Sequence, residues 1–115
     1  MSYYEENLLE ETLEILEEHG LTENDVEWVG NKSLYFSFDH FKKIADVDYD
    51  SGYGSSKVAI DLIVVGKDWW LERHEYDGSE WWEFKSIPKK PDTYREVDVV
   101  VGGMWSDIAE LNDLE

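Results

Sequence analysis

The segment from residue 57 to residue 85 constrains the fold most, because short turn signals divide it into three runs with strand character. These runs cover residues 57–65, 68–75 and 79–85, with Gly66-Lys67 and Asp77-Gly78 between them. Both dipeptides suit a two-residue hairpin turn. The sequence therefore predicts an antiparallel β-meander over residues 57–85.

Two-residue turns also determine the two faces of this meander, because side chains alternate along a strand. One face is suited to a core and carries Ile60, Leu62, Val64, Trp69, Leu71, Trp82 and Phe84. Arg73 shares that face opposite Trp82, where a cation–π contact is expected. The other face mixes rings with charged groups: Asp61, Ile63, Trp70, Glu72, His74, Tyr76, Trp81, Glu83 and Lys85. In each Trp-Trp pair, one ring thus points into the core and its neighbour faces outward or lies under the N-terminal helix.

This register places Asp61, Glu72 and Glu83 side by side on three adjacent strands, where like charges are unfavourable. Three interpretations remain open. A bulge shifts the register, the acids are simply well solvated, or they form an anionic strip that receives a cation or a basic partner.

Residues 3–19 are good helix formers, with Ser2 as the expected N-cap and Gly20 as the C-terminal stop. On a helical wheel the apolar side gathers Tyr4, Leu8, Leu9, Thr12, Leu13, Ile15 and Leu16. The opposite side gathers Glu6, Glu10, Glu11, Glu14, Glu17 and Glu18. No lysine or arginine precedes Lys32, so these acids lack the basic partners that normally support such a helix.

The remaining elements complete a single domain over residues 1–115. We expect a hairpin from residues 25–30 and 33–38, a helical segment at 41–46 capped by Ser37 or Asp39, and a strand at 94–101. A closing helix is predicted over 104–114, capped at Ser106, with Ile108 and Leu111 on its inner side. The predicted class is α+β, in which an N-terminal amphipathic helix packs on a mainly antiparallel sheet of about four to six strands. The fold includes the meander and ends in a short C-terminal helix.

Charge narrows the classes of partner. The chain holds 28 acidic and 10 basic residues, for a net charge of -18. Such a field repels nucleic acid and anionic membranes and attracts basic surfaces. Adaptation to high salt is the alternative, although eight lysines against two arginines and six tryptophans argue against it. With no cysteine, no secretion signal and no long apolar run, a cytoplasmic location is expected.

No catalytic motif is present, so the sequence predicts neither an enzyme nor a cofactor. Asp46, Asp48 and Asp50 resemble part of a calcium loop, but Ser51 and Lys57 replace the required glycine and bidentate glutamate. No metal site is therefore predicted. A glycosidase pair made of Glu72 and Glu83 is disfavoured because a small meander offers no deep cleft for a sugar.

The run EENLLEETLEILEE, in a small, acidic and cysteine-free chain, resembles the phage-encoded DNA-mimic inhibitors of restriction, CRISPR and DNA-repair proteins. The resemblance is to the class and covers fourteen residues and the overall charge. It implies an inhibitor without enzymatic activity, which occupies the nucleic-acid-binding groove of a basic protein and does not bind nucleic acid itself.

Two sets of partner-binding residues are expected. The helix contributes Glu6, Glu10, Glu14, Glu17 and Glu18, and the sheet contributes Asp61, Trp70, Glu72, Trp81 and Glu83. Two alternatives remain: an acidic face kept only for solubility, and a module that binds a carbohydrate or peptide on Trp70, Tyr76 and Trp81. Salt separates them, because binding between charged surfaces weakens with ionic strength and binding of a neutral ligand persists.

Overall fold

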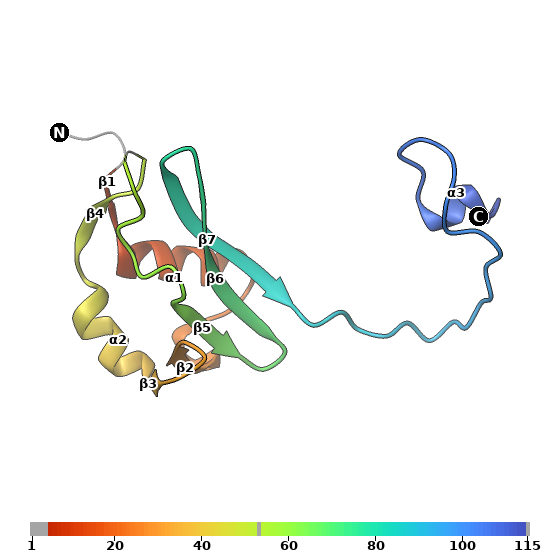
Figure 1. The fold of residues 1–115 in the computed structure, drawn as a ribbon. Helices are drawn as coiled ribbons and strands as arrows, with labels where there is room; N and C mark the ends of the chain where they lie inside the picture. Colours follow the sequence, from red (N-terminus) through yellow and green to blue (C-terminus); the bar gives the residue numbers. More distant parts are fainter. Residues whose placement is uncertain (1–4, 53, 115) are drawn as a thin grey trace.

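The computed structural model describes residues 5–52 and 54–114. An α+β body extends to residue 86, and the following residues form an arm that leads away from it (Figure 1). The strands are β1 (Glu5–Asn7), β2 (Val26–Gly30), β3 (Tyr35–Phe36), β4 (Asp48–Asp50), β5 (Ile63–Gly66), β6 (Trp69–Tyr76) and β7 (Ser79–Ser86). The helices are α1 (Leu8–Glu18), α2 (Phe38–Ala45) and α3 (Ile108–Leu111).

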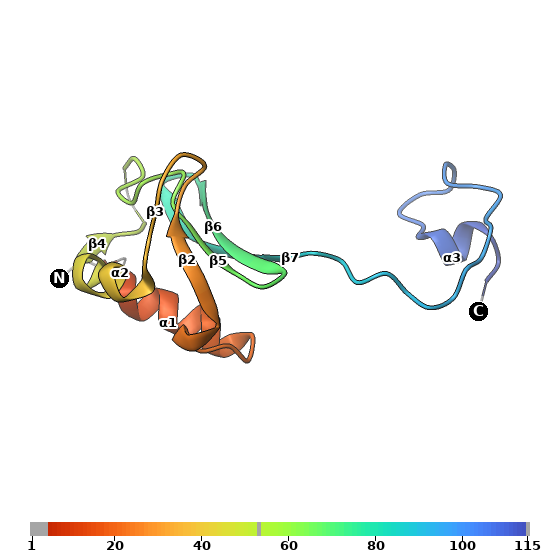
Figure 2. The same ribbon diagram turned by 90° about the horizontal axis from the view of Figure 1, so that it is seen from below.

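Five antiparallel strands form the main sheet, in the order β3-β2-β5-β6-β7. Helix α1 packs against β7 and α2 against β2, on the same side of the sheet (Figure 2). The core between helices and sheet contains Leu8, Leu16, Val29, Phe38, Phe41, Ala45, Val64, Trp69, Leu71 and Trp82. The α+β class, the N-terminal helix on an antiparallel sheet, the meander and a short C-terminal helix are therefore confirmed.

Helix α1 begins later than predicted. Residues 5–7 form β1, which pairs with β4, and the Asn7 side chain caps the helix by accepting a hydrogen bond from the Glu10 N–H at 3.0 Å. The expected helix over this stretch is wrong, because an Asn cap and a nonlocal strand pairing outweigh local helix propensity. Ser2, the expected cap, lies outside the described residues.

The end of α1 is confirmed at Gly20. This glycine has φ +71°, and the Leu21 N–H donates to the Leu16 carbonyl at 2.9 Å. The Gly20 N–H donates to the Glu17 carbonyl at 3.0 Å. Both bonds belong to a Schellman motif, in which glycine tolerates the left-handed conformation that a side chain disfavours.

The second hairpin has the expected register, with Arg73 opposite Trp82 and Glu72 opposite Glu83. Asp77 and Gly78 form its turn at φ +50° and +88°, as a type I′ turn requires. The guanidinium of Arg73 lies 4.8 Å from the centre of the Trp82 ring, which confirms the expected cation–π contact.

The first hairpin turns at Lys67-Asp68, one residue later than predicted. Ile63 therefore pairs with Glu72, and Val64 pairs with Leu71. The turn lies one residue later than predicted, so each pairing partner shifts by two positions. Because side chains alternate with a period of two, each side chain keeps its predicted face. The row of Asp61, Glu72 and Glu83 is wrong: Asp61 lies in a turn before β5 and accepts a hydrogen bond from Asn31 Nδ2 at 3.0 Å.

Gly66 is required for packing, because a Cβ atom there would overlap the indole ring of Trp69. Trp69 is buried and stacks on Phe84, so the ring has little room to move. Gly66→Ala should lower the free energy of unfolding by about 1–3 kcal/mol in urea denaturation. Lys67→Ala, at the exposed neighbouring position, is the control and should change it by less than about 0.5 kcal/mol. Equal stability of the two variants would contradict this packing role.

A polar cluster lies within the core beneath α1. Arg73 forms ion pairs with Glu80 at 3.0 Å and with Glu11 at 3.4 Å, and it donates to the Tyr49 hydroxyl at 2.9 Å. Burial, followed by the hydrogen bond to Glu11, raises the pKa of the Tyr49 hydroxyl. Glu80 also accepts hydrogen bonds from the N–H groups of Lys57 and Val58, so the cluster ties helix, sheet and loop together.

The C-terminal predictions need two corrections. Residues 94–101 form no strand, and the closing helix is reduced to α3, which Asp107 caps in place of Ser106. Ile108 is more than half exposed. The strand propensity of residues 94–101 and the helix propensity of residues 104–114 are not enough to form these elements. In the structure, both segments lie away from the sheet edge and the core that would stabilise them.

No helix in residues 5–52 and 54–114 has the length and apolar character needed to cross a membrane.

Candidate partner-binding surfaces

Two distinct surfaces carry the residues expected to bind a partner. The acidic face comprises Glu6, Glu10, Glu14, Glu17 and Glu18. The tryptophan face, on the side of the sheet away from α1 and α2, comprises Trp28, Trp70, Glu72, His74, Trp81, Glu83 and Lys85. The two surfaces point in opposite directions, since side chains alternate along a strand and the helices cover one side. One flat partner therefore cannot contact both at once.

Four glutamates of the acidic face form a stripe along α1. Glu10, Glu14, Glu17 and Glu18 are all exposed, and they are spaced at i, i+4, i+7 and i+8. At about 1.5 Å per residue the stripe is roughly 12 Å long. In the part of the chain that the structure describes, no lysine or arginine lies within ion-pair distance of these four carboxylates.

Glu6 belongs to β1, yet its carboxylate remains part of the same electrostatic surface. Partial burial raises its pKa, and the charges of Glu11, Glu14 and Glu10 raise it further. Glu11, predicted on the outer side of the helix, instead points toward Arg73 beneath it. The acidic face thus includes Glu6 from β1, and it does not include Glu11 of α1, whose carboxylate is directed toward the core.

The raised pKa of Glu6 has a testable effect on stability. The folded chain binds the Glu6 proton more tightly than the unfolded chain, so the ionised form destabilises the fold at neutral pH. Glu6→Gln should raise the free energy of unfolding by a few tenths of a kcal/mol at about pH 7, with solvent screening keeping the effect small. The gain should shrink as pH falls and disappear by about pH 3, where the carboxyl is protonated in both states. Urea denaturation at several pH values measures the free energy of unfolding, and Glu5→Gln is the control. A stability gain for Glu6→Gln that does not change with pH would contradict the prediction.

The tryptophan face repeats one pattern on two neighbouring strands. Trp70 donates its indole N–H to Glu72 at 2.7 Å, and Trp81 donates to Glu83 at 2.9 Å. The residue two positions later is a base in each case: His74 lies 2.8 Å from Glu72, and Lys85 lies 3.7 Å from Glu83. Each strand therefore carries the order Trp, Glu, base on its outward side, and the two copies run antiparallel.

These bonds hold both carboxylates in the charged form although they face each other across the strands. The indole hydrogen bond from Trp70, followed by that from His74, lowers the pKa of Glu72. The indole of Trp81 lowers the pKa of Glu83, and the charges of His74 and Lys85 lower it further. Since local donors already occupy the two glutamates, this face presents mainly rings to solvent and carries little net charge.

Trp28 also belongs to this face, although the sequence alone did not indicate it. It pairs with Val65, which pairs in turn with Trp70, so the row crosses three strands. Val29 is buried in the structure, so its neighbour Trp28 points to the opposite side of β2, and the register shift between Val26 and Trp28 is not visible in the sequence.

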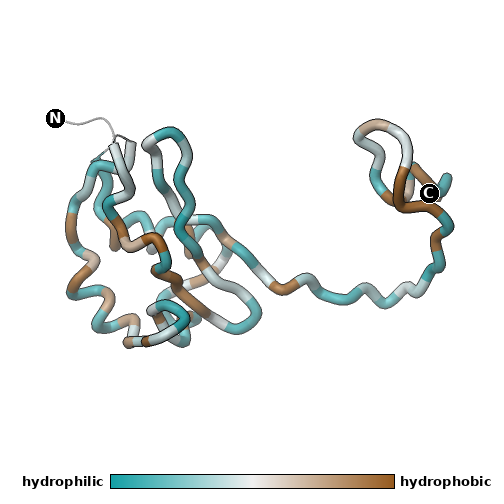
Figure 3. The backbone as a smooth tube through the Cα atoms, in the orientation of Figure 1, coloured by the Kyte–Doolittle hydropathy of each residue, from teal (hydrophilic) through white to brown (hydrophobic). Residues whose placement is uncertain are grey.

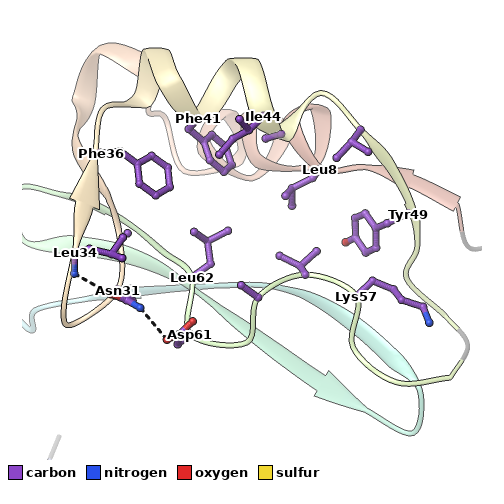
Figure 4. A pocket seen from close by; sticks show the side chains of 15 residues that line it. Leu8, Asn31, Leu34, Phe36, Phe41, Ile44, Tyr49, Lys57, Asp61 and Leu62 are labelled. Atoms are coloured by element: carbon purple, nitrogen blue, oxygen red, sulfur yellow. Dashed lines mark hydrogen bonds between the residues drawn. The ribbon is translucent and has the colours of Figure 1, made fainter.

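An apolar groove of about 470 Å³ lies between α2, the β2–β3 turn and the segment before β5 (Figure 4). Its apolar lining includes Leu8, Leu34, Phe36, Phe41, Ile44, Val47, Val58 and Leu62. At the rim, Asn31 accepts a hydrogen bond from the Leu34 N–H and donates one to Asp61. Leu34, Ile44 and Val47 are each at least half exposed, so the mouth of the groove is apolar as well.

Among the described residues, no group of three or more His, Asp or Glu side chains is arranged to hold a metal ion. Asp46 and Asp48 accept hydrogen bonds from Asn7, and Asp50 accepts one from the Gly52 N–H.

Comparison with protein families, curated proteins and solved structures finds no match to this chain.

Proposed function

We propose that this protein is a non-enzymatic acidic binding protein, which uses the acidic face to occupy a basic, nucleic-acid-binding surface of another protein. The observation that carries the proposal is the exposed stripe of four glutamates on α1, which has no lysine or arginine partner in the described part of the chain. Charges that are not neutralised within the fold remain available to a partner.

The spacing of the stripe suits a surface that grips phosphates. Four carboxylates over roughly 12 Å give about one charge per 4 Å, and one DNA strand carries one phosphate per about 3.4 Å. Lysines and arginines arranged to bind phosphates can therefore bind these carboxylates with similar spacing.

The stripe is also held rigidly, which reduces the entropy lost on binding. The buried Thr12 hydroxyl accepts a hydrogen bond from the Trp82 indole at 2.9 Å, and this bond ties the middle of α1 to β7. The Schellman motif at Gly20 fixes the end of the helix. Side chains at Glu10, Glu14 and Glu17 are thus presented on a preorganised helix.

The test is displacement of DNA from basic nucleic-acid-binding proteins captured from a cell lysate at low salt. We expect the chain to compete with duplex DNA, and we expect capture to weaken steeply as ionic strength rises, because surface charges are screened. Capture that is insensitive to salt, or captured proteins that bind DNA and this chain together, would refute the proposal.

A second candidate function rests on the tryptophan face. Three partly exposed indole rings lie on the side of the sheet away from α1 and α2, and the hydrogen bonds to Glu72 and Glu83 fix two of them in place. Rings fixed in this way offer a platform for a neutral carbohydrate or a peptide. Such a ligand should change tryptophan fluorescence and bind equally well at high salt, and Trp81→Ala should abolish the signal without affecting capture of a basic partner.

A further inference from the structure

The arm beyond β7 exposes large apolar side chains at its far end. Trp105 is 96% exposed, Met104 is 82% exposed and Val101 is 83% exposed. Figure 3 shows stretches of hydrophobic sequence in the C-terminal part of the chain. An apolar cluster of this kind on a charged protein is typical of a surface that another surface covers.

This end of the arm is a small folded module, residues 96–114. The Asn112 side chain accepts hydrogen bonds from the N–H groups of Asp98 and Val99 and donates to the Val99 carbonyl. Asp107 and Glu110 cap α3 reciprocally. The module therefore presents Met104 and Trp105 from a defined backbone, and it has no extensive core of its own to cover them.

The body offers an apolar surface that matches the module, namely the groove of Figure 4. Its volume of about 470 Å³ has room for a large side chain. Ile44, Leu34 and Val47 extend its apolar character to the mouth. Covering the groove and the exposed module with each other would remove both apolar surfaces from water.

Charge favours the same pairing. Residues 96–114 contain five acidic residues and no lysine or arginine. The three elements that form the groove carry four lysines, Lys32, Lys42, Lys43 and Lys57, against two acids, Asp39 and Asp61, and Lys57 lines the groove directly. Asp61, the one acid in the lining, is already bonded to Asn31. An acidic apolar module is thus complementary to an apolar groove whose elements carry more lysines than acids, in a protein whose net charge is strongly negative.

We propose that the module of one copy docks into the groove of a second copy, reciprocally, so that two chains exchange their arms. The arm leaves the body from β7, whereas the groove lies beside β2 and β3 at the other edge of the sheet. Pro88 and Pro91 stiffen the connection, and the arm points away from its own groove in both views (Figures 1 and 2). Reciprocal exchange closes the assembly as a symmetric dimer.

The chain contains no cysteine, which makes a cross-linking test clean. One sample is the Ile44→Cys chain. The other is the Met104→Cys chain, which carries a mass tag so that the two chains can be told apart. The samples are mixed at about 0.15 M salt, which screens the repulsion between the acidic bodies. Both positions are exposed, so the substitutions should not disturb folding. We expect a disulfide between the two different chains to form at least about tenfold faster than between Met104→Cys and Glu14→Cys, because docking raises the effective concentration.

Adding Trp105→Ala to the Met104→Cys chain should remove this advantage, whereas Tyr94→Ala, at another exposed aromatic of the arm, should preserve it. Sedimentation of the unmodified chain should show a dimer. Equal cross-linking rates for the two pairs would overturn the proposal. A monomer in which cysteines at 44 and 104 of one chain join only to each other would also overturn it, because the module would then cover its own groove. No partner protein enters this test, so its outcome is independent of the proposed function.

Discussion

Arg73→Leu is expected to lower the free energy of unfolding by about 3–5 kcal/mol. The side chain of Arg73 is 4% exposed and is the only lysine or arginine within ion-pair distance of Glu11 or Glu80 among the described residues. Removing it leaves two carboxylates in or near the core without a cation. A loss of this size is a large fraction of the stability of a typical domain.

The stability lost in Arg73→Leu should depend on the carboxylate charges that remain in the cluster. In the double variant Arg73→Leu with Glu80→Gln, one uncompensated carboxylate is gone, while the amide oxygen can still accept a hydrogen bond from Lys57 or Val58. This double variant should be more stable than Arg73→Leu alone. Urea denaturation followed by tryptophan fluorescence measures both. A loss below about 1 kcal/mol for Arg73→Leu would show that water solvates the cluster.

Replacing Glu10, Glu14 and Glu17 with glutamine should weaken capture of a basic partner by at least about tenfold at low salt, because steering and contact both depend on the summed charge. The loss should shrink as salt rises. Stability should stay constant or increase slightly, since like charges three or four positions apart on a helix repel by about 0.2–0.5 kcal/mol per pair and glutamine is a good helix former.

A charge-matched control separates the acidic face from overall charge. Glu27→Gln, Glu75→Gln and Asp77→Asn are exposed positions outside α1, and both triple variants change the net charge from -18 to -15 by removing three acids. The control should retain most of the affinity. If both variants lose the same affinity, net charge alone accounts for binding and α1 is a solvated face.

The meander illustrates what the sequence could and could not predict. Asp77-Gly78 is a strong hairpin signal, and it gave the right register for β6 and β7. Gly66 misled the prediction because it looked like a turn residue, whereas its role is to make space for Trp69. The shift of the turn by one residue moved every β5–β6 pair by two positions, so the faces were still correct but the predicted pairs were not, and Asp61 is not opposite Glu72.

Nonlocal contacts account for the other differences. The pairing of β1 with β4 joins segments about forty residues apart, and no local pattern encodes it. Glu11 lies in a periodic acidic run, yet Arg73, sixty-two residues later, draws it inward. At the C-terminus, the valines of residues 97–101 have strand propensity but no strand to pair with in a single chain.

The sequence predicts those parts of the candidate surfaces that depend on the local periodicity of one helix or strand. Helical periodicity placed Glu10, Glu14, Glu17 and Glu18 on one exposed side, and strand alternation placed Trp70 and Trp81 together. The bonds from these rings to Glu72 and Glu83 need atomic positions, as does the groove formed by three separate segments. The opposite orientation of the two surfaces also follows only from the assembled fold.

Carboxylate footprinting of the complex tests the central claim most directly. The chain is labelled with a carbodiimide and an amine, alone and bound to a basic protein captured at low salt, and each modified site is quantified by mass spectrometry. The account predicts that Glu10, Glu14, Glu17 and Glu18 become protected, while Glu75 and Asp77 react as in the free chain. Unchanged labelling of the four α1 glutamates, with protection at Glu72 and Glu83 instead, would contradict it and move the interface to the tryptophan face.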